Sequence, residues 1–128
     1  MDPKPSSKVV LITGCSSGFG LLTAAYLAQQ GYQVIATMRN LERSSGLVNE
    51  LSKRGAKADI LPLDVTNKDT MRAALAQIAE KYGYIDILIN NAGYGIGGAF
   101  EDLTDEEIRA QFDANFFGVQ NVIREAIR

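Results

Sequence analysis

The sequence predicts an α/β fold built on a doubly wound parallel sheet, and three observations lead to this prediction. Short apolar runs rich in β-branched residues alternate with stretches of helix-forming residues, in the order βαβαβαβα. Each run is apolar at consecutive positions, so both faces of every strand should be covered by helices. Strands that are separated by helix-length segments pair in parallel through right-handed crossovers.

The first half of the chain supplies two strand–helix units. Lys8–Thr13 (KVVLIT) is the first predicted strand, and the helix-forming run 21–30 after it ends at Gly31. Gln33–Thr37 (QVIAT) is the second buried strand. Leu41–Arg54 follows as a helix whose first half is weakened by two serines and a glycine.

The third unit begins with a predicted strand over Asp59–Val65. Pro62 cannot donate to a neighbouring strand, which favours a position at the sheet edge or at a strand end. Thr66 with Asp69 three residues later resembles a helix start. The helix that follows has one apolar face at helical spacing, made by Met71, Ala74, Leu75, Ile78 and Tyr82.

The fourth unit is the strand Ile85–Asn90, a glycine-rich loop over 91–100 and a last helix. Thr104 and Glu107 form the T-x-x-E pattern of a capping box at the start of this helix. An apolar stripe then runs along one continuous helix toward the C-terminus, through Ile108, Phe112, Phe116, Val119 and Ile123.

The composition is that of one soluble domain with a sizeable core, since 46% of the 128 residues are hydrophobic. Thirteen basic and fifteen acidic residues give a net charge of −2 without a basic patch, which argues against nucleic acid or a membrane surface as partner. The chain has no histidine and one cysteine, Cys15. A disulfide within the chain, a Cys/His zinc site and a histidine base are therefore excluded, and we expect no metal.

The expected cellular location is inferred from the lack of a membrane-spanning run and of a signal peptide in the sequence. No apolar run approaches the ~20 residues that span a bilayer, and the first residues contain no apolar signal-peptide region. We therefore expect a cytoplasmic protein, in which residues 1–7 are a disordered tail. Cys15 is interpreted as a small packing residue, with a reactive thiol as the alternative.

The glycine turn LITGCSSGFG directly after the first strand is the most informative stretch. Gly14, Gly18 and Gly20 can supply a tight turn, close approach of a phosphate to the backbone and close helix–strand packing. The unpaired N–H groups and the dipole of the following helix favour an anion at this position. The hypothesis is a dinucleotide site, and the alternative is a flexible strand–helix connection.

The residues at the end of the second strand indicate which dinucleotide the site would bind. An NAD site carries an acidic residue about 20 residues after the glycine turn, whereas this sequence has Met38 followed by Arg39. A guanidinium pairs with a 2′-phosphate, and the hydroxyls of Ser17 and Thr37 could add donors. NADP is therefore predicted over NAD, and the alternative is that Arg39 is a solvated surface residue.

Five motifs together resemble the short-chain dehydrogenases/reductases, and the resemblance covers the chain from Lys8 onward. They are TGCSSGFG (13–20), ATMRN (36–40), LDV (63–65), NNAG (90–93) and NFFG (115–118). The resemblance implies a Rossmann-type sheet with strand order 3-2-1-4. It also implies that 8–128 is a dinucleotide-binding domain, the N-terminal half of a longer parent.

The resemblance implies a set of cofactor-binding residues. Asp64 would lie near the adenine amino group and Val65 against the adenine ring, while the NNAG segment would lie by the ribose and nicotinamide. The complete set is Gly14, Ser16, Ser17, Phe19, Gly20, Arg39, Asp64, Val65, Asn91, Ala92 and Gly93.

The chemistry implied by the resemblance is hydride transfer between nicotinamide and a carbonyl or alcohol substrate. The family uses a tyrosine with a lysine four residues later, a serine and an asparagine, and only the asparagine has a counterpart here, Asn115. None of the tyrosines has a lysine four residues on; they are Tyr26, Tyr32, Tyr82, Tyr84 and Tyr94. The 128-residue chain alone is therefore predicted to be inactive.

Two other hypotheses stay open at this point. The chain could be a non-catalytic module that binds a nucleotide, or a half-fold that associates with itself. Self-association, or a homo-oligomer, would use the exposed sheet edge along Ile85–Asn90 and the apolar stripe of the last helix.

Overall fold

The computed structural model describes residues 7–128, so the predicted disordered tail over 1–7 lies outside the described residues except for Ser7. Its centre is a parallel sheet in the order β3-β2-β1-β4, which confirms the predicted fold class and strand order. The strands are β1 (Val9–Ile12), β2 (Gln33–Met38), β3 (Asp59–Pro62) and β4 (Ile87–Ile89).

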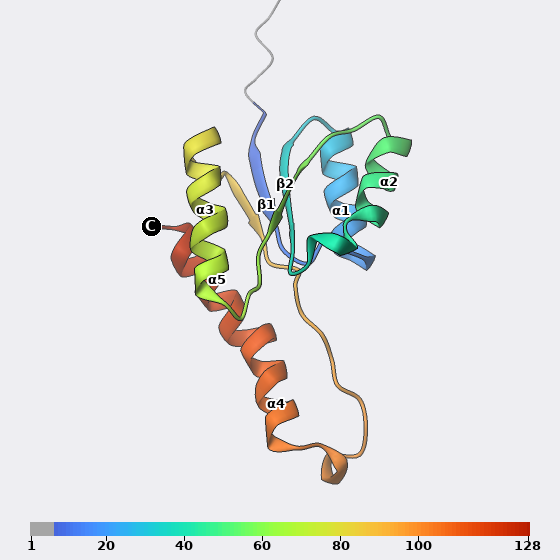
Figure 1. Cartoon of the computed structure of the whole chain (residues 1–128), viewed down its shortest axis with the longest axis vertical. Helices are drawn as coiled ribbons and strands as arrows, with labels where there is room; N and C mark the ends of the chain where they lie inside the picture. Colours follow the sequence, from blue (N-terminus) through green and yellow to red (C-terminus); the bar gives the residue numbers. More distant parts are fainter. Residues whose placement is uncertain (1–6) are drawn as a thin grey trace, which may run out of the picture.

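Helices cover both faces of this sheet, as the apolar strands predicted (Figure 1). The α-helices are α1 (Gly18–Gln29), α2 (Ser45–Lys53), α3 (Lys68–Tyr82), α4 (Asp105–Phe112) and α5 (Gly118–Ala126). The short 3₁₀ turns η1 (Leu41–Arg43) and η2 (Phe100–Asp102) precede α2 and α4, and the π-helical turn η3 (Asp113–Phe117) joins α4 to α5. The pair α1 and α2 lies on one face, and the pair α3 and α5 lies on the other.

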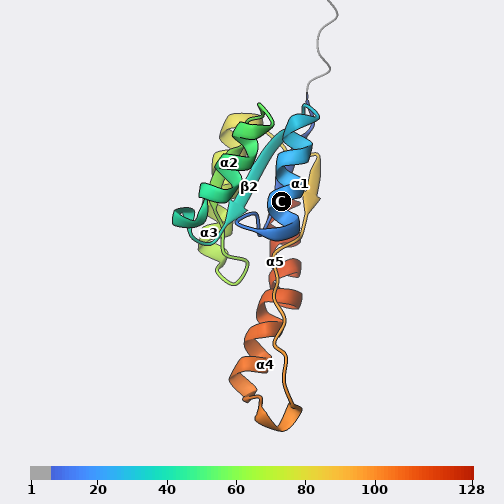
Figure 2. The same cartoon turned by 90° about the vertical axis from the view of Figure 1, so that its right-hand side faces the viewer.

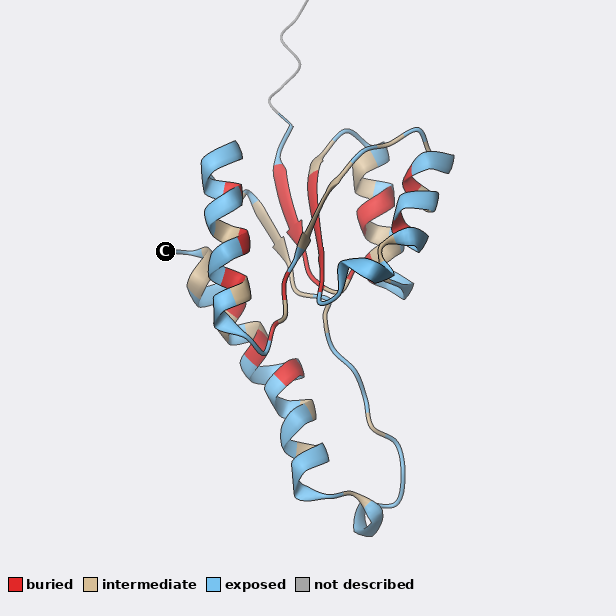
Figure 3. Cartoon of the chain, in the orientation of Figure 1, coloured by how far each residue is buried: buried red, intermediate tan, exposed pale blue. Residues whose placement is uncertain are grey.

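The alternation of side chains along β1 divides the core between these two faces. Val10 and Ile12 pack with the residues of α1 and α2, whereas Leu11 packs with Ile78 of α3. All four residues of β1 are buried, and Figure 3 shows the buried residues gathered in β1, β2 and the inner sides of the helices. The central strand therefore positions the glycine turn that follows it.

Two predicted elements are shorter than expected. The helix predicted over Leu41–Arg54 is divided, because the Asn40 side chain accepts a hydrogen bond from Glu42 N–H and closes the turn η1 before α2 begins at Ser45. The strand predicted to reach Val65 ends at Pro62, which lacks an N–H, and β3 is an edge strand. The edge position inferred from Pro62 is thus confirmed.

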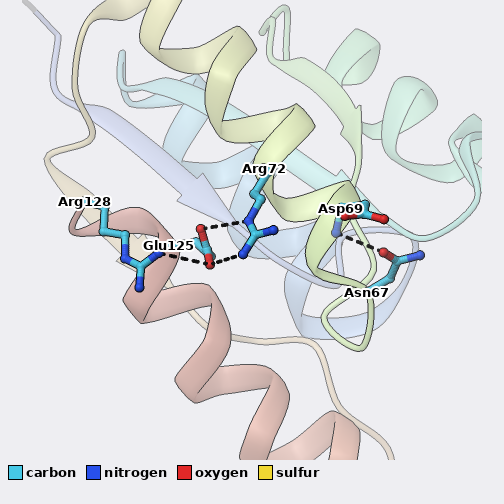
Figure 4. Close-up of polar contacts among 5 residues, drawn as sticks. All are labelled: Asn67, Asp69, Arg72, Glu125 and Arg128. Carbon is cyan, nitrogen blue, oxygen red and sulfur yellow. Dashed lines mark hydrogen bonds and ion pairs between the residues drawn. The ribbon is translucent and has the colours of Figure 1, made fainter.

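The predicted start of α3 at Thr66 is wrong by one residue. Asn67 is the cap, and its side-chain oxygen accepts from the Asp69 backbone N–H at 3.0 Å (Figure 4). Thr66 instead donates through its backbone and its hydroxyl to the Asp64 carboxylate. Because the Thr66 hydroxyl is bound to Asp64, it does not cap α3 as the sequence pattern predicted.

The last helical region also departs from the prediction of one continuous helix. The capping box of Thr104 and Glu107 is confirmed, but the π-helical turn Asp113–Phe117 interrupts the helix. The core-facing residues after α4 are Ala114, Gly118 and Val122. The phenylalanines of the predicted stripe are therefore more than half exposed.

An ion-pair cluster fastens α5 to α3. Arg72 of α3 lies 3.3 Å from the Glu125 carboxylate, and Arg128 lies 3.9 Å from the same oxygen (Figure 4). Beyond α5, the helix α4 and the loop before it project away from the sheet (Figure 2). None of the residues of α4 is buried.

Within residues 7–128, no helix combines the length and the apolar character that crossing a membrane requires.

Candidate cofactor-binding site

A cavity of about 660 Å³ opens at the carboxyl ends of the strands. Its wall comes from the turn after β1 and from the segments that follow β2, β3 and β4. This is where ligands bind in doubly wound sheets, and the volume is in the range of small-molecule and cofactor pockets.

Most of the predicted cofactor-binding residues meet at this cavity. Those that line it are Gly14, Ser16, Ser17, Phe19, Arg39, Asp64, Val65, Asn91, Ala92 and Gly93. Two predicted site residues, Gly20 and Asn115, are not part of the lining.

Gly14 and Gly20 explain why the turn needs glycine. Gly14 has φ +72°, and a Cβ there would lie 2.8 Å from Ala92 Cα. A Cβ on Gly20 would lie 2.1 Å from the Gly14 carbonyl oxygen. Gly20 therefore lets α1 pack closely under the turn, and its contact with a cofactor stays a prediction.

The N-terminus of α1 lies at the cavity, and no side chain of the helix caps its first backbone N–H groups. Ser17 is the N-cap in extended conformation and makes no side-chain cap hydrogen bond. The first turn contains no acidic residue, and Phe19 beside it is 86% exposed. Unpaired amides and the positive end of the helix dipole suit an anionic group such as a phosphate.

Thr13 and Asn91 join the first turn to the end of β4. The buried Thr13 hydroxyl accepts from the backbone N–H groups of Asn91 and Ala92, at 3.1 and 3.0 Å. The Asn91 amide donates to the carbonyls of Thr13 and Gly14, at 3.2 and 3.0 Å. The two sides of the cavity are therefore held at a set distance before any ligand binds.

Arg39 lies exposed after β2, on the wall of the cavity. Thr37, which we expected to donate to the same ligand, is fully buried, and its hydroxyl donates to the Ile12 carbonyl at 2.9 Å. The prediction for Thr37 is wrong because both faces of β2 are covered, so its side chain lies in the core and its hydroxyl is bound to the backbone of β1.

Asp64 is half-buried on the cavity wall with a fixed orientation. Its Oδ1 accepts from Thr66, and its backbone N–H donates to the Thr70 hydroxyl at 2.9 Å. Val65 beside it is buried except for the part that reaches the lining. This pair offers a carboxylate and an apolar surface at the β3 end of the cavity.

Cys15 is a packing residue, as predicted. Its side chain is completely buried, and its thiol donates to the Ile12 carbonyl at 3.4 Å. Burial raises the pKa of this thiol to about 11, so it stays protonated at neutral pH.

Asn115 lies in the π-helical turn and binds the loop rather than the cavity. Its Oδ1 accepts from the Tyr94 backbone N–H at 2.9 Å, and its Nδ2 donates to the Tyr94 carbonyl. In the described chain the side chain has this positioning role.

Several lining residues were missed from the sequence. They are Met38, Thr66, Tyr94, Ala110, Asp113 and Ala114. Met38 lies within the ATMRN motif, and Thr66 and Tyr94 directly follow the LDV and NNAG motifs, so these three could have been found from the motifs. The last three lie on α4 and η3, and only the fold brings them to the cavity.

The strand order and the position of the cavity define a Rossmann-type domain. More narrowly, the chain belongs to the short-chain dehydrogenase family, whose family model ("short chain dehydrogenase") matches residues 8–128.

Named relatives are oxidoreductases of this family. The chain is 43% identical over 120 residues to a 3-ketodihydrosphingosine reductase of Bacteroides thetaiotaomicron, and 37% identical over 122 residues to a 3beta-hydroxysteroid dehydrogenase of Mediterraneibacter gnavus. Each match covers 94% of this chain, but only 41% and 44% of the relatives. The chain thus spans less than half the length of these relatives.

Solved structures agree with the fold. A mutant actinorhodin polyketide ketoreductase, solved with NADPH, matches with a TM-score of 0.88 and 35% identity. The match covers 95% of this chain and 47% of that one.

Proposed function

We propose that residues 8–128 form a dinucleotide-binding domain and that the dinucleotide is NADP. One observation carries the proposal: the glycine turn, the bare N-terminus of α1 and Arg39 line a single cavity. The resemblance to a ketoreductase that was solved with NADPH supports it.

The strand order β3-β2-β1-β4 supports an orientation for the proposed cofactor. The pyrophosphate would lie over the turn after β1, against the amides of Ser16 and Ser17. The adenosine would lie toward Asp64 and Val65, and the nicotinamide toward Asn91–Gly93 on the β4 side. When bound, the nicotinamide supplies or accepts the hydride.

The reaction of the whole protein is hydride transfer between this nicotinamide and a carbonyl or alcohol substrate. The names of the relatives, a ketone reductase and a hydroxysteroid dehydrogenase, support this reaction class. The chain itself has no histidine, and no tyrosine with a lysine four residues later. We therefore propose that these 128 residues hold the cofactor without turning over a substrate. Separately, we propose that the protein is cytoplasmic.

Arg39 decides the proposed preference for NADP over NAD. Its guanidinium stands at the β2 end of the cavity, where an NAD site has an acidic residue. A guanidinium forms charge-assisted hydrogen bonds with a 2′-phosphate, which NAD lacks.

Calorimetric titration of NADPH and NADH into the chain and into Arg39→Asp tests this proposal. We expect the substitution to weaken NADPH binding roughly 10- to 100-fold, the effect of a lost charged hydrogen bond, and to leave NADH binding little changed. Arg124→Asp, an equal change of charge on the exposed side of α5, is the control. Preference of the unaltered chain for NADH, or no effect of Arg39→Asp, contradicts the assignment.

A turnover assay with NADPH and a panel of ketones tests the second part. Binding of NADPH without oxidation is the expected result. Oxidation of NADPH by the pure chain would show that a reaction centre exists among these residues.

A further inference from the structure

The segment after β4, residues 93–98, borders the cavity but has little packing of its own. Gly93 and Tyr94 line the cavity, and Ile96 is half-buried. A Cβ added to Gly95 or Gly97 would meet no atom within 4 Å. The position of this segment therefore depends on hydrogen bonds from other elements.

Two amide side chains supply such bonds from the helical region beside the segment. Asn115 binds both backbone groups of Tyr94, and Gln111 Oε1 accepts from the Ile96 N–H at 2.7 Å. Gln111 and Asn115 are four residues apart, so they lie on nearly the same side of the helical region. Asn115 was expected from a motif, whereas nothing in the sequence reasoning singled out Gln111.

We propose that Gln111 is a positioning residue, which holds Ile96 and thereby fixes Tyr94 in the wall at the β4 end of the cavity. Asn115 holds the segment at Tyr94, and Gln111 supplies a second point of attachment two residues further on. Among the described residues, Gln111 makes the one side-chain hydrogen bond to the backbone of 95–98. The two attachments together keep the wall preformed, so that the nicotinamide end of a bound cofactor meets an ordered surface.

The effect of Gln111 on ligand binding rests on the proposed function, because it assumes that the cavity is the NADP site. Only ligands that reach the β4 end should depend on Gln111. NADPH reaches it, whereas adenosine 2′,5′-bisphosphate carries the adenine and the 2′-phosphate but has no nicotinamide.

Hydrogen exchange of the Ile96 amide, measured by NMR on the unliganded chain, tests the attachment itself. Gln111→Leu removes the acceptor at similar volume, and we expect exchange at Ile96 to accelerate roughly tenfold. Gln111→Glu keeps an acceptor oxygen and should retain protection near that of the unaltered chain. Gln120→Leu, the same change at an exposed position of α5, is the control.

Binding of the two ligands to the same variants tests the role. Gln111→Leu should weaken NADPH several-fold and leave adenosine 2′,5′-bisphosphate unchanged, while Gln111→Glu and Gln120→Leu bind both as before. Unchanged exchange at Ile96 in Gln111→Leu, or equal weakening of both ligands, overturns the inference. If the unaltered chain binds neither ligand, the proposed function fails, and the exchange comparison still decides whether Gln111 holds the segment.

Discussion

Asp59 shows at the scale of a single residue how a surface carboxylate ties two elements together. It lies at the start of the edge strand β3, where its Oδ2 accepts from the Tyr82 hydroxyl and from Lys81 Nζ at 2.9 Å. Burial by itself raises the pKa of Asp59, but the hydrogen bonds from Tyr82 and Lys81 outweigh it and lower the pKa. The charged form of Asp59 therefore stabilises the contact between β3 and α3.

The lowered pKa predicts a dependence of stability on pH. A carboxyl group whose pKa is lower in the folded state stabilises the fold above its unfolded pKa, near 3.8, and this contribution is lost as the pH falls through the folded value. We expect Asp59→Asn to cost about 1 kcal/mol of unfolding free energy at pH 7, since the contact is partly exposed. At an acidic pH that protonates Asp59 in the folded chain, the difference from the unaltered chain should vanish.

Urea unfolding at the two pH values, followed by circular dichroism, measures this effect. Asp102→Asn, an exposed acidic residue in η2, is the control and should change little at either pH. An equal loss for Asp59→Asn at both pH values would mean that the charge of Asp59 is not involved.

The residues of the candidate site were predictable where backbone position alone decides them. The turn after β1 needs Gly14 because Ala92 approaches it, and in a parallel sheet a turn after one strand must lie beside the ends of its neighbours. The hydroxyl of Thr37 was not predictable in this way, since the Ile12 carbonyl competes for it inside the core. Local patterns do not reveal such competition between a ligand and a buried acceptor.

At the scale of an element, the start of α3 shows two adjacent polar residues with different roles. The sequence pattern could not tell which of them is the N-cap. Asn67 caps the helix, whereas Thr66 is bound to Asp64. We expect Asn67→Ala to destabilise the chain by about 1 kcal/mol, the usual cost of a lost N-cap. Thr66→Ala should cost less, because Thr66 Oγ1 is exposed and supports only the turn.

Chemical denaturation of the two single variants and of the double variant measures these costs. A larger loss for Thr66→Ala than for Asn67→Ala would restore Thr66 as the cap.

Element type was predictable throughout, and element boundaries were less so. Period and composition were sufficient for the four strands and the helices between them. The division of 41–54 depends on one side-chain bond of Asn40, and the π-helical turn Asp113–Phe117 accompanies the burial of Ala114. Neither changes the hydrophobic period enough to be read from the sequence.

At the scale of the whole molecule, the last helical region has a surface with several exposed large apolar side chains. Its members lie on α4, η3 and α5 and directly after α5; they include Phe112, Phe116, Phe117, Ile123 and Ile127. The rings of Phe116 and Phe117 pack edge to face, and Phe112 and Phe117 line a second cavity of about 470 Å³. Contiguous apolar patches of this kind mark interaction sites.

We expect this surface to associate with a second copy of the chain. Sedimentation velocity at increasing concentration should show a dimer or larger species, and Phe116→Glu should shift the protein toward the monomer. Val48→Glu on α2, a residue equally exposed but on the opposite face of the sheet, is the control and should leave association unchanged. A chain that remains monomeric at high concentration contradicts this expectation.

The central place of β1 in the sheet has a consequence for how the protein is made. The strand is synthesised before its partner on one side, β4, which is distant in the chain: the contact from Val9 to Asp86 spans 77 residues. Until that partner is synthesised, one edge of this strand, which is completely buried in the fold, has only water or other chains to bond with. We therefore expect an interval during translation in which shielding of the nascent chain limits aggregation, and a pause in that interval should favour aggregation over folding.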